Sequence, residues 1–140
     1  MNSLMTSPDS AAGGALSMPV PANASPARLA RRAAFAAEEK LGRDTAIIDV
    51  GEALSITDFF VITSAVNDRQ VRSIVDEVER HLTEVEGVKP LRVEGLDHLG
   101  WVLMDYGSFV VHVFDEATRA FYDLERLWRS LPRLALVEPT

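Results

Sequence analysis

Apolar residues recur every three or four positions in three stretches of the chain. This spacing predicts helices over residues 26–41, 68–86 and 116–131. Each stretch follows a residue whose side chain can cap a helix, and these residues are Ser25, Asn67 and Asp115. The pattern therefore places one helix early in the chain, a long one in the middle and one near the end.

Between the helices lie shorter runs rich in apolar and β-branched residues, which are typical of strands. Five strands are predicted, over residues 45–50, 59–63, 90–94, 101–106 and 109–114. Gly107-Ser108 joins the last two, which indicates a hairpin. The resulting order is helix, two strands, helix, three strands, helix.

This order predicts a single α/β domain, α+β-like in its hairpins, with a mixed five-stranded sheet. The second strand, the long helix and the third strand form a crossover, which we expect to be right-handed. We expect the helices mainly on one face, with the crossover and C-terminal helices on the same side. The other face is then partly open, and an open sheet face with apolar residues is a candidate binding surface.

The chain has 140 residues, 47% of them hydrophobic, which suits one domain with its own core. We divide it into a disordered N-terminal arm (1–25), a folded domain (26–131) and a C-terminal tail (132–140). The absence of cysteine excludes disulfides and thiolate metal sites. No apolar run approaches the roughly 20 residues of a membrane span, and no basic leader is present, so we expect a cytoplasmic protein.

Charge is distributed unevenly along the chain, whose formal net charge is −7. Residues 44–125 contain 17 acidic and six basic residues, whereas residues 28–43 and 126–140 each carry a positive balance. An acidic middle is a poor general binder of phosphate backbones. It favours a basic protein as partner.

Candidate catalytic groups are sparse. Asp49, Asp58 and Asp105 lie in or beside predicted strands, but each lacks the second acid that a paired metal site places on the same side of a strand. Glycine stands at that position after Asp49 and Asp105, so we interpret these acids as turn caps or surface groups. The sequence holds neither a serine elbow nor a phosphate loop. We therefore expect no catalytic residue, metal or cofactor, and no enzyme.

The histidines and the two arginine clusters can each be interpreted as structural or as functional. The three histidines are His81, His98 and His112. None has a second ligand at metal-ligand spacing, which favours structural roles for them. The arginine clusters share helical faces, and they comprise Arg28, Arg31 and Arg32 in the first helix and Arg126, Arg129 and Arg133 near the last. Either cluster could touch RNA phosphates, but a solvated face or a helix-dipole contact is favoured.

Several short motifs stand in a specific order. They are Asp49-Val50-Gly51, residues 55–62 (SITDFFVI), residues 67–71 (NDRQV), Glu94-Gly95, residues 101–107 (WVLMDYG), residues 110–114 (VVHVF) and residues 122–128 (YDLERLW). In this order the chain resembles the ribosomal silencing factor family, also called Iojap-like, over roughly residues 28–129. Ala65 and Ser108 depart from residues usual in that family, which weakens an anion-binding turn after Ser64 and alters the hairpin turn.

The resemblance implies a nucleotidyltransferase-like α/β fold without catalytic activity. It implies a translational repressor that binds the large ribosomal subunit through ribosomal protein fourteen and sterically blocks joining of the small subunit under nutrient limitation. Peripheral rRNA contact and a homodimer of the free protein are left open. The residues that match the family's partner-binding strand are Trp101, Asp105 and Tyr106, with Met104 and His112 as weaker candidates.

Two other interpretations stay open at this point. One is a metal-dependent nucleotidyltransferase that uses Asp49 or Asp105, and the other is an RNA-contacting factor in large-subunit biogenesis. The docking face is also undecided, since alternation places Trp101 and Asp105 on one side of their strand and Met104 and Tyr106 on the other.

Overall fold

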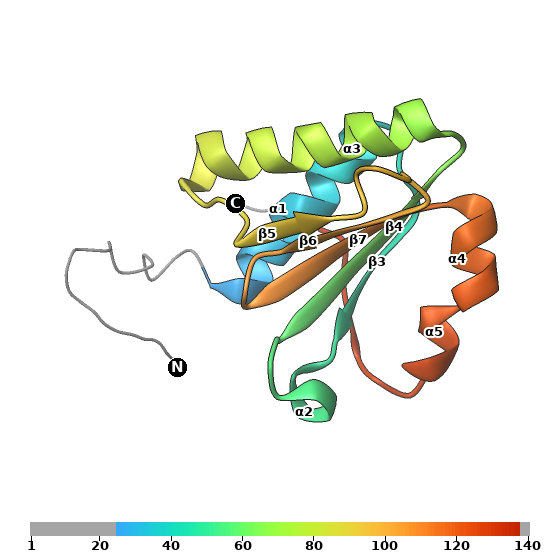
Figure 1. Cartoon of the computed structure of the whole chain (residues 1–140). Coiled ribbons are helices and arrows are strands. Elements are labelled where there is room, and N and C mark those ends of the chain that lie inside the picture. The colour runs from blue at the N-terminus through green and yellow to red at the C-terminus, as the bar shows by residue number, and fades with distance from the viewer. Residues whose placement is uncertain (1–24, 138–140) are drawn as a thin grey trace.

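A computed structural model describes residues 25–137, so the predicted arm lies outside the described residues except for Ser25. Six strands form one sheet in the order β5-β6-β7-β4-β3-β8. Figure 1 shows how the helices flank it. The elements are α1 (Pro26–Glu39), β3 (Arg43–Asp49), α2 (Gly51–Leu54), β4 (Phe59–Ala65), α3 (Asp68–His81), a π-helical turn (Leu82–Glu86), β5 (Arg92–Glu94), β6 (Trp101–Asp105), β7 (Phe109–Asp115), α4 (Glu116–Tyr122), α5 (Leu124–Leu127) and β8 (Arg133–Leu134). Within this described range no helix is both long and apolar enough to cross a bilayer.

The sheet is mixed, as predicted, because β4 and β7 run parallel and every other neighbouring pair runs antiparallel. The prediction of five strands was wrong. The sixth strand is β8, which pairs Leu134 with Ile47 of β3 in the segment assigned to the C-terminal tail. A strand of two residues is too short to show an alternating pattern, so this strand could not be predicted from the sequence.

The two long helices cover one face of the sheet, which we call the first face (Figure 1). Ser25 caps α1 as predicted, its hydroxyl oxygen accepting the Arg28 amide at 3.2 Å. The buried side of α1 consists mostly of alanine, and these short side chains let the helix lie close to β4 and α3. Asn67 caps α3, its side-chain oxygen accepting the Gln70 amide at 2.9 Å. The helical run ends at Gly87, which has a φ of +68°.

The C-terminal helix differs from its prediction in two ways. It breaks at Asp123, whose φ of +47° ends α4 and redirects the chain into α5. It also packs on the second face, opposite α1 and α3, where Leu124 and Trp128 contact the sheet. Helical periodicity identifies an apolar stripe but not the sheet face that receives it, so the expectation of one shared side was wrong. The second face is consequently half-covered.

The predicted crossover from β4 through α3 reaches β5 at the edge of the sheet. Since β5, β6 and β7 alternate in direction and β7 is parallel to β4, β5 also runs parallel to β4. The chain then fills the gap between them with β6 and β7. This places β6, the strand of the predicted partner-binding residues, next to a three-residue edge strand. Kinship with nucleotidyltransferases stays a prediction.

Candidate functional site

The second face carries the candidate site. Alternation along β6 places Trp101, Leu103 and Asp105 on this face, while Val102 and Met104 are buried under the helices on the first face. Strand register sets Leu103 opposite His112 of β7. The prediction that Trp101 and Asp105 share a side is thereby confirmed.

Trp101 is held on three sides by other rings. Its indole stacks on Phe114 with centroids 4.9 Å apart and lies 4.9 Å from the ring of Tyr122 on α4. Its Nε1–H donates to Nδ1 of His112 at 3.0 Å. The side chain stays half-buried, so part of the ring remains available to a partner.

His112 lies beneath this cluster and is only 4% exposed. The edge of Phe60 contacts its ring at a centroid distance of 4.5 Å. Burial lowers the pKa of His112 to about 4, because the apolar surroundings disfavour the charged imidazolium. The ring is therefore neutral at pH 7 and carries one proton. Because Nδ1 accepts from Trp101, that proton lies on Nε2.

Stability is expected to depend on pH through His112. Its folded-state pKa lies below the ordinary value of 6.5, so the unfolded chain binds the proton more readily. The stabilising contribution is complete above pH 6.5 and declines as pH falls toward 4, with a loss of about 2 kcal/mol by pH 5. Urea unfolding of wild type and His112→Leu at pH 7 and pH 5 measures it. Only wild type should lose this part of its unfolding free energy between pH 7 and pH 5. Equal pH dependence in both proteins would contradict the assignment to His112.

Asp105 shapes the hairpin between β6 and β7. Its Oδ1 accepts the amide of Gly107 at 2.8 Å, and its Oδ2 accepts from Nε of Arg92 at 3.3 Å. Gly107 has a φ of +87°, a conformation that favours glycine. The carboxylate remains partly exposed at the rim of the second face, where it can meet a positively charged group.

Tyr106 and Met104 lie elsewhere. Tyr106 is 8% exposed and belongs to the core of the first face, where its ring stacks on Phe109 with an interplanar angle of 6°. Burial raises the pKa of its hydroxyl well above the ordinary value. Met104 is buried in the same core. A role in partner binding stays a prediction for both, and it would act through packing rather than direct side-chain contact.

Sequence reasoning missed several residues around the site. Leu91 is 74% exposed beside the Asp105 turn, and Ile56 is 83% exposed in the loop after α2. A backbone contact supports Trp101, since a Cβ on Gly95 would lie 2.2 Å from the Trp101 carbonyl oxygen. Isolated apolar residues outside a periodic pattern carry no signal in one sequence.

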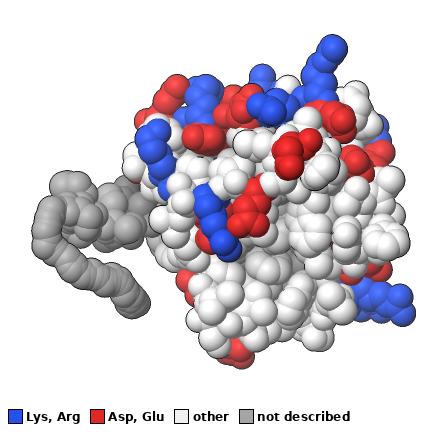
Figure 2. Space-filling view, viewed as in Figure 1, with Lys and Arg blue, Asp and Glu red and all other residues white. Residues whose placement is uncertain are grey.

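In Figure 2 charged side chains gather along α3, and the lower part of the view is mostly uncharged.

The carboxylates do not come together as a metal centre would require. Asp49 ends β3 and Asp105 ends β6. Two strands, β7 and β4, lie between these strands, which separates the two residues by about 14 Å at the usual strand spacing. Asp49 accepts the Gly51 amide at 3.2 Å, the turn-capping role expected of it. Among residues 25–137 no group of three potential metal ligands lies together.

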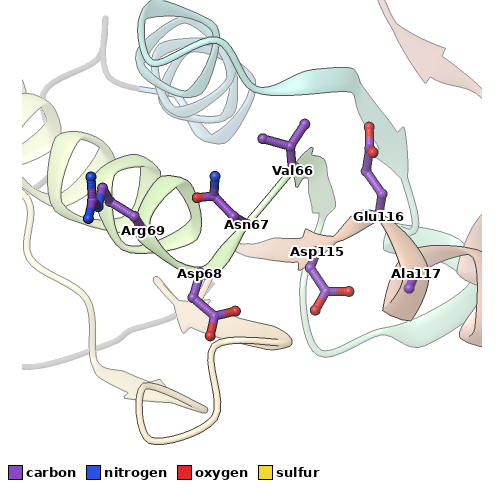
Figure 3. A pocket seen from close by; sticks show the side chains of 7 residues that line it. All are labelled: Val66, Asn67, Asp68, Arg69, Asp115, Glu116 and Ala117. Atoms are coloured by element: carbon purple, nitrogen blue, oxygen red, sulfur yellow. The ribbon is translucent and has the colours of Figure 1, made fainter.

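A cavity of about 870 Å³ lies at the carboxyl ends of the parallel strands β4 and β7. Figure 3 shows the starts of α3 and α4 on either side of it, with the carboxylates of Asp68 and Asp115 pointing the same way. Its lining residues are Val66, Asn67, Asp68, Arg69, Asp115, Glu116 and Ala117. The negative charge of these carboxylates disfavours binding of an anion in the cavity. The turn between β4 and α3 therefore serves to cap α3 through Asn67.

The two arginine clusters differ in their pairing. Arg28 and Arg32 of α1 form ion pairs with Glu86, at 3.3 and 2.5 Å. Near the other end of the chain, Arg126 and Arg129 are exposed, and within the described range neither has a carboxylate at ion-pair distance. Arg28 and Arg32 therefore contribute to the fold, whereas Arg126 and Arg129 have no carboxylate partner among the described residues.

The fold and the second face define a small mixed-sheet α/β domain with an aromatic cluster on a half-covered face. A crystal structure of a protein from Chromobacterium violaceum has the same fold, with a TM-score of 0.72 and 29% identity over 83% of this chain and 96% of that chain.

The chain belongs to the ribosomal silencing factor family. The family model described as "Ribosomal silencing factor during starvation" matches residues 22–139. Ribosomal silencing factor RsfS of Bacillus subtilis is 36% identical over 100 residues, which cover 71% of this chain and 84% of the relative. The mouse protein "Mitochondrial assembly of ribosomal large subunit protein 1" is 34% identical over 89 residues, 61% of this chain and 39% of that protein. The resemblance in the motifs is thus confirmed.

Proposed function

We propose that this protein is a translational repressor that binds the large ribosomal subunit through ribosomal protein fourteen and sterically blocks joining of the small subunit when nutrients are limiting. Family membership supports this proposal, since its relatives are named as silencing factors and the mouse relative for its part in large-subunit assembly. The bacterial relatives favour action in the cytoplasm. Blocking by occlusion requires affinity and bulk, and it requires no catalytic group.

The Trp101 cluster is the observation on which the docking site rests. Aromatic anchors with few conformations left to lose contribute a large share of binding energy at interfaces. Trp101 meets this description, because Phe114, Tyr122 and His112 hold a ring that is still partly exposed. Asp105 adds a carboxylate at the rim, which suits a basic ribosomal protein.

A subunit-joining assay tests the function. Purified large and small subunits are mixed with increasing amounts of the protein and separated by sedimentation. We expect fewer joined ribosomes, with the protein travelling only with large subunits. Undiminished joining at saturating protein would contradict the proposal. Light scattering of the free protein tests the homodimer that the family resemblance left open.

Site-specific crosslinking tests the partner. The chain has no cysteine, so Leu103→Cys on the second face introduces a unique attachment point. We expect its crosslinks on large subunits to reach ribosomal protein fourteen. Glu84→Cys, on the exposed turn after α3, is the matched control and should not reach it. Equal yields from both positions, or crosslinks from Leu103→Cys to another protein, would contradict this partner.

We also propose a peripheral contact between rRNA phosphates and the free guanidinium groups of Arg126 and Arg129. Replacing both residues with alanine should weaken large-subunit binding and flatten its salt dependence. The slope of log K against log salt should fall by about 1.5, roughly 0.7–0.9 for each lost phosphate contact. Binding measured between 50 and 200 mM salt reports this slope, with Arg80→Ala on α3 as control. An unchanged slope would show that Arg126 and Arg129 do not contact rRNA phosphates.

A further inference from the structure

His112 is a polar side chain in an apolar setting. Strand register surrounds it with Leu103 of β6 and Ile62 of β4, and its ring also contacts Phe60. Burying an imidazole there costs stability unless its nitrogens find partners. Nε2 has no partner among the described residues, so the fold obtains only one hydrogen bond from this side chain. A leucine of similar size would fill the space without that cost, which suggests that the residue serves something other than packing.

The one hydrogen bond connects His112 to Trp101. Nδ1 accepts the indole Nε1–H at 3.0 Å, and the stacking ring of Phe114 and the tilted ring of Tyr122 restrict the same indole from other directions. Stacking alone permits a ring to slide or rotate in its plane, whereas a directional hydrogen bond at its polar edge fixes that rotation. Because His112 lies on β7, which pairs with β6 on one side and β4 on the other, the hydrogen bond attaches the indole to an interior strand of the sheet.

We propose that His112 is a positioning residue for docking, which holds the indole of Trp101 in the orientation that the partner meets. This proposal rests on the proposed function. The indole N–H is used within the protein, so the partner contacts carbon atoms of the ring and gains no hydrogen bond from it. The benefit to binding is preorganisation, since the free protein already holds the side chain as the complex needs it.

Two substitutions separate this role from packing. His112→Asn places a carbonyl oxygen near the position of Nδ1 and keeps an acceptor, whereas His112→Leu fills the volume and removes it. Val111→Ala is the matched control, because Val111 lies on the same strand but its side chain is buried on the first face. The indole N–H signal in the NMR spectrum, assigned with Trp101→Phe to distinguish it from Trp128, reports the hydrogen bond in the free protein. Large-subunit binding reports docking.

We expect wild type and His112→Asn to protect the Trp101 indole proton from solvent exchange and to bind within about threefold of each other. His112→Leu should lose the protection and bind at least about tenfold more weakly while remaining folded, and Val111→Ala should change neither readout. Weaker binding by His112→Leu with no rescue by His112→Asn would overturn the positioning role. Lost protection with unchanged binding would overturn it as well. If wild type fails to bind large subunits, the proposed function fails, and the indole signal still shows separately whether the hydrogen bond exists.

Discussion

Replacing Glu86 with alanine is expected to lower the free energy of unfolding by about 4 kcal/mol. The Glu86 side chain is 8% exposed and its Oε2 lies 3.3 Å from Nε of Arg28 and 2.5 Å from Nε of Arg32. Both arginines belong to α1, so one carboxylate links α1 to the π-helical turn that follows α3. Its removal would leave two largely buried guanidinium groups without a counter-charge, which costs far more than the loss of an exposed ion pair.

Urea unfolding of the full chain measures this effect. Glu84→Ala is the matched control, since Glu84 lies two residues away and pairs with Arg80 in an exposed ion pair, and it should cost no more than about 0.5 kcal/mol. Equal destabilisation by the two substitutions would show that the buried cluster contributes nothing special. Glu86→Gln should fall between them, because an amide keeps an acceptor oxygen but no charge.

This cluster also shows where sequence reasoning stops. Helical spacing correctly placed Arg28 and Arg32 on one face of the first helix, but the spacing could not identify what that face meets. The answer depends on a π-helical turn at Leu82–Glu86 that changes the direction of the last side chains before Gly87. No residue type signals such a turn, so the pattern favoured a solvated face over an RNA contact and did not indicate the ion pairs with Glu86.

Local chemistry predicted much of the framework. The caps Ser25, Asn67 and Asp115 begin the helices where expected, and each accepts the amide three residues ahead. Alternation assigned Trp101 and Asp105 to one side of β6. These features depend on neighbours within a few residues, which is the range over which a single sequence is informative.

The candidate site is formed by contacts between residues that are far apart in the sequence. The hydrogen bond from Trp101 to His112 joins two strands through their register, and Tyr122 reaches the same ring only because α4 packs on the second face. The sequence indicated neither the register nor that face. The family resemblance alone grouped Met104 and Tyr106 with Trp101. Alternation along the strand placed them on the opposite side, where the structure also has them.

Replacing Trp101 with alanine is expected to weaken large-subunit binding by at least about 100-fold, equivalent to about 3 kcal/mol, and to restore subunit joining in the presence of the protein. The substitution removes the ring that the second face offers and leaves His112 without its donor. Trp101→Phe keeps an aromatic ring in the cluster but also removes the donor to His112, so it should bind at least about tenfold more weakly than wild type and still more tightly than Trp101→Ala. The difference between the two variants therefore isolates the contribution of the aromatic surface.

The control for general loss of apolar surface is Phe121→Ala. Phe121 is also aromatic and is 80% exposed on α4. Its ring contacts Tyr122 at a centroid distance of 5.0 Å but is not paired with the indole, so its loss should leave binding within about threefold of wild type. Thermal unfolding shows which variants remain folded at the assay temperature, because Trp101→Ala also removes packing against Phe114 and Tyr122. A folded Trp101→Ala protein that binds large subunits as tightly as wild type would place the docking surface elsewhere on the molecule. Loss of binding in both alanine variants would instead move its centre toward α4.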